Sequence, residues 1–380
     1  MLQQLYEALG GMSWLMNAGW QPGLSCDVPH QLAWHGTECA GSTILRLKLV
    51  ANGLRGTLPT ELGHLPDLKE LLVESNPLLS GTIPTEIGGL RALRTLSFDN
   101  NTRLSGSIPA TLDQMSNLEY LSAHTNSLSG ALPEQIVLNR LQYLDLSQNM
   151  IGGHMPPPLH MSNARYLSLH TNRISGTLSN NIGRLDRLID RAYLHRNQIS
   201  GFLPSQLGNL TQIPILSLRE NSLSGTLPTE LGSLTLVNFP ALSYNRVSGT
   251  VPSELTVGKW GTVEGRLDLM SNLIDDRSEQ EQFDAQIVRR PYNDATPFER
   301  SRFSTAERAI SAWYERLESG QCEWRDSPRG RFQCSISASR NLLPKVDYRS
   351  YGQSAGHTTS PHPDAYGNAN ELEVLAAQRG

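Results

Sequence analysis

Apolar and polar positions recur in one arrangement along the first 275 residues, and the stretch LEYLSAHTNSLSGALP (118–133) shows it clearly. Leu118, Leu121 and Ala123 hold the apolar positions, and the alternation over the last two predicts a short strand with one buried face. A single such strand cannot bury that face alone, so stacked copies are expected to bury it against one another. An asparagine follows each copy at intervals of 23 to 27 residues, which indicates a solenoid. We call these ten residues the ladder asparagines: Asn52, Asn76, Asn101, Asn126, Asn149, Asn172, Asn197, Asn221, Asn245 and Asn272.

The asparagine, glycine and proline that follow each predicted strand recur because the chain must turn there and its backbone groups need hydrogen-bond partners. An asparagine amide both donates and accepts, so it can bond the backbone groups of its own turn and of the neighbouring coil. Repetition would satisfy amides that are otherwise buried without a partner. Gly130 permits a tight bend, and Pro133 favours an extended return.

The motif L-x-x-L-x-L-x-x-N-x-L-S-G-x-I/L-P resembles the plant-specific subtype of the leucine-rich repeat. The segments LSGTIPTEIG (79–88), LSGSIPATL (104–112) and LSGTLPTELG (223–232) carry it almost letter for letter, and the resemblance covers about residues 1–275. It implies an α/β fold: a right-handed solenoid with a parallel sheet on its concave face and helical caps. The subtype is also similar to extracellular receptor-like ectodomains and polygalacturonase-inhibitor-like proteins.

We expect four regions along the chain. They are an N-terminal cap (1–43) with a helix over 2–9, about ten repeats (44–275), a C-terminal cap region (276–345) and a disordered tail (346–380). Two repeats depart from the pattern, because Ser179 replaces the proline of the sixth and Pro240 occupies a strand position of the ninth. Proline removes a ladder donor, so a weakened strand is expected there.

The cap sequence WHGTEC (34–39) is similar to the W-x-G-x-x-C run that ends the family's N-terminal cap. A disulfide between Cys26 and Cys39 would close a short loop and stabilise the cap. Zinc is the alternative, since His30 and His35 lie between the cysteines, but the order matches no common zinc finger. An extracellular setting favours the disulfide.

The region after the repeats contains one further helix signal and two further cysteines. Residues 304–318 have capping-box spacing and an apolar stripe, which predicts a helix that covers the open end of the last coil. Cys322 and Cys334 flank a short polar loop and are expected to form a second disulfide.

The variable positions beside the apolar ones form columns on the open face of the sheet, roughly 45 Å long at ~4.8 Å per coil. The columns six and two places before the ladder asparagines are rich in tyrosine, histidine and arginine. The candidate ligand-binding residues come from these two columns, with Tyr193 from the column between them: Tyr120, His124, Tyr143, Tyr166, His170, Tyr193, His195 and Arg219. Tyrosine and arginine dominate binding energetics at interfaces. The alternative is that tyrosine is a common filler whose cross-strand stacking stabilises the sheet, and that the histidines are simply solvated.

Other features narrow the class of function. The net charge of −4 gives no reason to expect nucleic acid or an anionic membrane as a partner. No apolar run has the ~18 residues of a membrane span, and no signal peptide is visible. Asn100 and Asn209 begin N-glycosylation sequons. No phosphate-binding loop or nucleophile motif is present, and an open face lacks the water-excluding pocket of an enzyme, so neither catalysis nor a cofactor or metal is expected.

The sequence therefore favours a non-catalytic module that binds a protein, peptide or glycan on the concave face, outside the cell. An adhesion role at a cell surface or wall is the alternative, and family likeness suggests a third, inhibition of a cell-wall-degrading enzyme. The ligand and the oligomeric state are not determined by the sequence.

Overall fold

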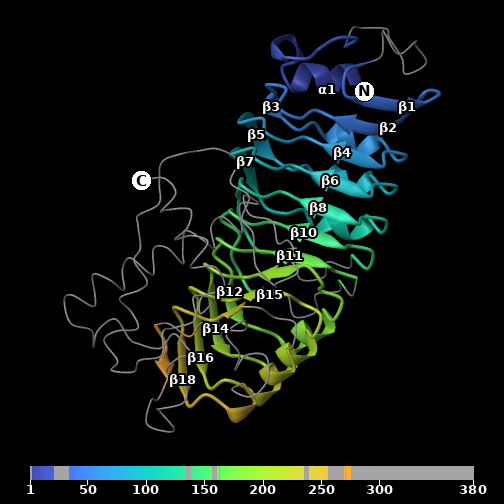
Figure 1. Cartoon of the computed structure of the whole chain (residues 1–380). Coiled ribbons are helices and arrows are strands. Elements are labelled where there is room, and N and C mark those ends of the chain that lie inside the picture. The colour runs from blue at the N-terminus through green and yellow to red at the C-terminus, as the bar shows by residue number, and fades with distance from the viewer. Residues whose placement is uncertain are drawn as a thin grey trace, which may run out of the picture.

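The computed structural model describes residues 2–20, 34–133, 138–155, 161, 163–234, 239–255, 269 and 271–274. The expected helix 304–318, Cys26, Cys322, Cys334 and the tail lie outside these residues. Within them the chain forms a curved stack of coils that begins at helix α1, Leu2–Ala8 (Figure 1). The expected leucine-rich-repeat solenoid with a parallel concave sheet is confirmed.

Each coil contributes one strand to the concave sheet, and these strands pair in parallel from coil to coil. The pair β1–β2 at the N-terminal edge is the exception, because it is antiparallel. The ten described strands of this sheet are: β1 (Thr37–Ala40), β2 (Thr43–Lys48), β4 (Glu70–Leu72), β6 (Thr95–Ser97), β8 (Tyr120–Ser122), β10 (Tyr143–Asp145), β11 (Tyr166–Ser168), β13 (Arg191–Tyr193), β15 (Ile215–Ser217) and β17 (Phe239–Ala241).

A second set of short strands follows the ladder asparagines and forms two lateral sheets. One sheet holds β3 (Arg55–Thr57), β5 (Leu78–Thr82), β7 (Arg103–Gly106) and β9 (Ser127–Leu128). The other holds β12 (Ser175–Thr177), β14 (Gln198–Phe202), β16 (Ser222–Gly225), β18 (Arg246–Gly249) and β19 (Leu273–Ile274). Isolated bridges at Ala131–Gly152 and His154–Ser175 join the two sheets across the fifth coil.

The described return segments are 3-10 helices, and those of directly adjacent coils contact each other. A coil of about 24 residues leaves only one five-residue turn for this segment, which is too short for a stable α-helix. These helices are: η1 (Gly11–Ser13, in the cap), η2 (Thr60–His64), η3 (Thr85–Gly89), η4 (Ala110–Gln114), η5 (Asn180–Arg184), η6 (Ser205–Asn209), η7 (Thr229–Ser233) and η8 (Ser253–Leu255). Within the described residues, no helix has the length and apolarity to cross a bilayer.

The ladder asparagines connect neighbouring coils through backbone hydrogen bonds. The Oδ1 atom of Asn76 accepts from the amides of Asn52 and Leu54 at 3.0 and 3.1 Å, and its Nδ2 donates to the carbonyl of Leu49 at 2.8 Å. The pattern repeats as far as Asn272, which bonds the previous coil through Val247 and Leu242. The residue before each of the ten asparagines has a positive φ of 48 to 57°, which turns the chain into the core. Backbone groups inside the solenoid therefore have partners.

The N-terminal cap replaces a preceding coil. Asn52 exchanges hydrogen bonds with the backbone of Met16, at 2.6 and 3.0 Å. The rings of Trp14 and Trp20 pack edge-on at 4.7 Å, and Trp20 stacks on Trp34 at 5.2 Å. The aromatic cluster thus covers the apolar end of the first coil.

The two departures from the motif have different outcomes. The side chain of Ser179 accepts a hydrogen bond from the Asn181 amide at 3.2 Å, so it caps η5 where other coils use proline. Pro240 lies in β17, which pairs in register with β15 and is the last described strand of the sheet. A strand therefore forms there, and whether it is weaker than the others stays a prediction.

We expect the substitution Asn76→Ala to lower the free energy of unfolding by about 3 kcal/mol, because it leaves the buried amides of Asn52 and Leu54 in the preceding coil without their acceptor. Chemical denaturation measures this change. Asn180→Ala, an exposed asparagine of η5, is the matched control and should change stability by less than about 0.5 kcal/mol. Equal losses in both variants would contradict the ladder as the source of stability.

Candidate functional site

Three tyrosines form a continuous stack on the concave face. The strands β8, β10 and β11 place Tyr120, Tyr143 and Tyr166 side by side in register. Their ring centroids lie 4.3 and 4.2 Å apart with interplanar angles of 9° and 6°. Each ring is partly exposed, so the stack presents a flat aromatic surface to solvent while its inner edge packs on the sheet. Such a surface can contact the apolar parts of a ligand and can also stabilise the sheet.

Two buried carboxylates lie beside the tyrosine stack. Asp99 accepts hydrogen bonds from the Ser122 hydroxyl at 2.6 Å and the His124 amide at 3.0 Å, and its Oδ2 atom lies 3.3 Å from the His124 Nε2. Asp145 accepts from the hydroxyl of Ser147 at 2.6 Å and from the hydroxyl of Tyr166 at 3.3 Å. Local donors therefore already occupy these carboxylates, which fixes the positions of the side chains around the stack.

Burial sets the electrostatics of this part of the face. It raises the pKa of Asp99 above its ordinary value, although the charge of His124 and the hydrogen bond from Ser122 oppose the rise. Burial is also the main cause that raises the pKa of Tyr143, and the charges of Tyr166 and Asp145 add to it. The tyrosines therefore act as neutral hydrogen-bonding groups at physiological pH.

A second cluster lies next to the stack along the sheet and contains His170, Tyr193, His195 and Arg219. The two imidazoles stack at 4.5 Å, and the Tyr193 ring meets them edge-on at 6.0 and 5.7 Å. The exposed fractions of His195 and Arg219 are 0% and 1%. His195 is therefore a buried side chain and not a solvated surface histidine. Burial, helped by the charge of Arg219, lowers the pKa of His195 and keeps its ring neutral.

Sequence reasoning missed several residues that position this site. The hydroxyls of Thr125 and Thr171 lie 2.9 and 3.0 Å from the Nδ1 atoms of His124 and His170. Both threonines occupy the positive-φ position before a ladder asparagine. That position recurs in every coil, so the sequence does contain the signal that could have identified them.

The remaining predicted sites stay predictions. Cys39 lies in β1, but Cys26 is outside the described residues, so neither the disulfide nor the zinc alternative is tested. Among the described residues, no group of three or more His, Cys, Asp or Glu side chains is arranged to hold a metal ion. Asn100 and Asn209 are exposed, as glycosylation requires, and Asn209 ends η6.

Comparisons with known proteins agree on the repeat. A family model described as Leucine Rich Repeat matches residues 140–161. The plant peptide hormone receptor RGFR1 in complex with RGF2 is 33% identical over 59% of this chain and 35% of its own, with a TM-score of 0.54. The ectodomain of the Arabidopsis thaliana receptor kinase GASSHO1/SCHENGEN3, in complex with CASPARIAN STRIP INTEGRITY FACTOR 2, is 29% identical over 64% of this chain and 32% of its own, with a TM-score of 0.54.

A plant ice-binding protein is also similar, with 25% identity over 66% of this chain and 87% of its own and a TM-score of 0.50. No curated protein sequence matches the chain. The fold and the repeat motif define a solenoid of the leucine-rich-repeat class. The chain forms leucine-rich repeats of the plant-specific type and resembles plant receptor ectodomains. It spans about a third of the length of the two receptor ectodomains.

We expect the stability of the protein to fall as the pH rises above about 10, the ordinary tyrosine pKa. The folded pKa of Tyr143 lies above that value, so the folded state binds more protons than the unfolded state there, and each unit of pH costs stability. Denaturation between pH 8 and 12 should show a shallower loss for Tyr143→Phe than for the wild type. Full tyrosinate absorbance in a still-folded protein near pH 10 would contradict this prediction.

Proposed function

We propose that the chain is a recognition module that binds an extended peptide across its concave face, outside the cell. The partly exposed stack of Tyr120, Tyr143 and Tyr166 carries this proposal. Rigid aromatic rings offer contact area at a low cost in side-chain entropy, which is why tyrosine is frequent at binding surfaces. One similar protein is described as a plant peptide hormone receptor in complex with RGF2, and a second as a receptor kinase ectodomain in complex with CASPARIAN STRIP INTEGRITY FACTOR 2, which supports a ligand of this kind.

The neighbouring groups fit a peptide better than a purely apolar ligand. The Tyr166 hydroxyl and the His124 ring border the stack, so backbone amides and carbonyls of a peptide would find partners beside the rings. Asp99 and Asp145 bond side chains of the face itself, and this ordering before binding would reduce the entropy cost of association. A protein or a glycan could also use the ring contacts and hydrogen bonds of this surface. The test below distinguishes these ligands from a peptide.

A second candidate function rests on the lateral sheets and is the binding of ice. Serines repeat there at coil spacing, and the hydroxyls of Ser80, Ser105 and Ser200 each donate to a glycine carbonyl of the previous coil, at 3.1, 3.1 and 3.2 Å. Thr82 and Thr177 are among the exposed residues beside them. A flat array of hydroxyls at ~4.8 Å spacing suits a periodic surface, and a plant ice-binding protein of similar extent shares the fold.

The peptide proposal is tested with a displayed library of random dodecapeptides selected on the wild-type protein. We expect selected peptides to bind the double variant Tyr143→Ala, Tyr166→Ala at least tenfold more weakly, because the aromatic surface is gone. Circular dichroism and thermal denaturation establish that this variant is folded. Phe202→Ala removes a ring that is 72% exposed on the lateral sheet and is the matched control. If the selected peptides bind all three proteins equally, the concave stack is not their site.

The ice candidate is tested by the inhibition of ice recrystallisation. The double variant Thr82→Tyr, Thr177→Tyr should need at least tenfold more protein for the same inhibition, because it adds a protruding ring to two further coils and interrupts the array of hydroxyls there. The ring of Phe202 already occupies the equivalent position of its coil, so an aromatic side chain fits there. Thr95→Tyr on the concave sheet is the control. An inactive wild-type protein would remove this candidate.

A further inference from the structure

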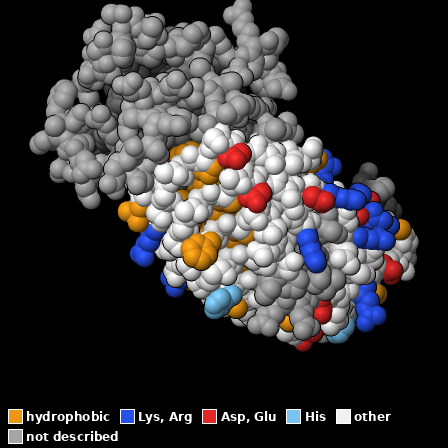
Figure 2. Space-filling model, turned by 90° about the horizontal axis from the view of Figure 1, so that it is seen from below, with side chains coloured by type: hydrophobic (Ala, Val, Ile, Leu, Met, Phe, Trp, Pro, Cys, Tyr) orange, Lys and Arg blue, Asp and Glu red, His pale blue; other side chains and the backbone are white. Residues whose placement is uncertain are grey.

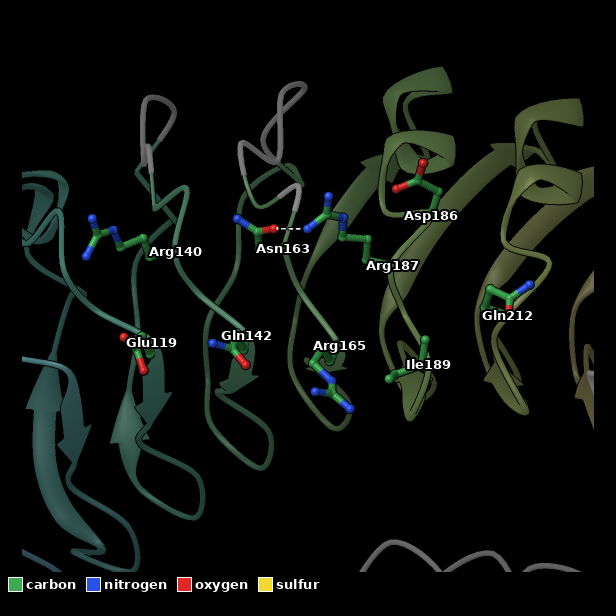
Figure 3. A pocket seen from close by; sticks show the side chains of 9 residues that line it. All are labelled: Glu119, Arg140, Gln142, Asn163, Arg165, Asp186, Arg187, Ile189 and Gln212. Atoms are coloured by element: carbon green, nitrogen blue, oxygen red, sulfur yellow. Dashed lines mark hydrogen bonds between the residues drawn. The ribbon is translucent and has the colours of Figure 1, made fainter.

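A groove lined mainly by charged and amide side chains runs along the rim of the solenoid where the chain enters the concave strands, beside the tyrosine stack. It has a volume of about 740 Å³. Figure 3 shows side chains of successive coils pointing into it in two rows, one from the turns before the strands and one from the strand entrances. The lining residues are: Glu119, Arg140, Gln142, Asn163, Arg165, Asp186, Arg187, Ile189 and Gln212. None of them belongs to the candidate site on the concave face.

Two arginines of the groove, which lie two coils apart, each donate a hydrogen bond to an asparagine side chain of a preceding coil. The Nη1 atom of Arg140 donates to the Oδ1 of Asn117 at 2.8 Å, and the Nη1 of Arg187 donates to the Oδ1 of Asn163 at 2.5 Å. Each asparagine in turn donates its Nδ2 to a backbone carbonyl of the coil before it. The guanidinium groups are thus oriented, and their other N–H donors have no carboxylate partner among the described residues.

The charge of the groove favours an anion. Three arginines line it against two carboxylates, and Glu119 already lies 3.5 Å from Arg94 outside the lining. Within the described part of the chain, no carboxylate pairs with Arg140, Arg165 or Arg187, and all three side chains are exposed. Figure 2, an end view of the molecule, shows Lys and Arg side chains gathered mainly toward one edge and mostly uncharged groups over the middle.

One inserted residue shapes the wall of the groove. The coil that ends at Asn197 has an extra residue before its strand, so Leu188 is buried and Ile189 is displaced outward with 39% of its surface exposed. The amides of Gln142 and Gln212 lie in the same groove and can both donate and accept. Amides, guanidinium groups and one aliphatic side chain together match the backbone and acidic side chains of a peptide.

We propose that this groove binds an extended acidic peptide in a polyproline II conformation. Arg140 and Arg187 are two coils apart, which is roughly 10 Å at ~4.8 Å per coil. A polyproline II helix has three residues per turn and rises ~3.1 Å per residue, so every third side chain repeats on one side after roughly 9 Å. Carboxylates at that spacing would meet both arginines, with bidentate hydrogen bonds to the guanidinium groups. The site is separate from the concave face and does not depend on the function proposed above.

The probe is a fluorescent peptide of three Asp-Pro-Pro repeats, measured by anisotropy. One control peptide has asparagine in place of aspartate, and another has the three aspartates adjacent. We expect the regular acidic peptide to bind at least tenfold more tightly than the asparagine peptide and at least threefold more tightly than the clustered one. The double variant Arg140→Gln, Arg187→Gln should lose at least tenfold in affinity.

The matched control is the double variant Arg103→Gln, Arg246→Gln, which removes the same charge from exposed positions of the lateral strands β7 and β18. It should change affinity by no more than twofold. Equal losses in the two arginine variants, or equal binding of the acidic and asparagine peptides, would overturn the proposal. The variant Tyr143→Ala, Tyr166→Ala should bind the probe normally. If instead it alone loses the probe, the peptide occupies the concave face and the groove assignment is wrong.

Discussion

Buried backbone amides are the constraint on which this structure depends. A coil of about 24 residues must turn inward and outward again, and each turn places N–H and C=O groups where water cannot reach them. The ladder asparagines satisfy these groups, because one Oδ1 accepts from the previous coil and one Nδ2 donates to it. The left-handed residue before each asparagine aims the amide inward. With this requirement met by the ladder asparagines, the outward positions are free to vary, and the proposed binding surfaces are built from them.

The two surfaces with binding chemistry differ because they use different outward positions. The concave face carries neutral rings whose hydroxyls stay protonated and whose neighbouring carboxylates are already hydrogen-bonded. The rim carries exposed guanidinium groups oriented by asparagines such as Asn117. A ligand that needs flat apolar contact and one that needs charge would therefore not compete for the same residues.

The fold can be predicted from the sequence because the buried backbone groups of every coil need hydrogen-bond partners. An asparagine supplies those partners at a nearly constant interval, which is visible in the sequence. The register of Tyr120, Tyr143 and Tyr166 follows from that period as well. The burial of His195 does not, because it depends on side chains packed against it, such as the His170 ring of the previous coil. The position of Ile189 could have been found from the 25-residue interval between Asn172 and Asn197, whereas the orientation of Arg187 required the side-chain geometry.

The close packing of glycine in the lateral sheets has a consequence for assembly. A Cβ on Gly106 would lie 2.6 Å from the Thr82 Cγ2 atom, so each coil offers a hollow that receives a side chain of the coil before it. Such head-to-tail contacts are heterologous and have no built-in end, so the surface that accepts one coil could accept another molecule. At the N-terminal end, the backbone of Ala8 fills the hollow over Gly56. Helix α1 therefore closes the hollow at this edge, so the hollow is not open to the lateral strand of a second molecule.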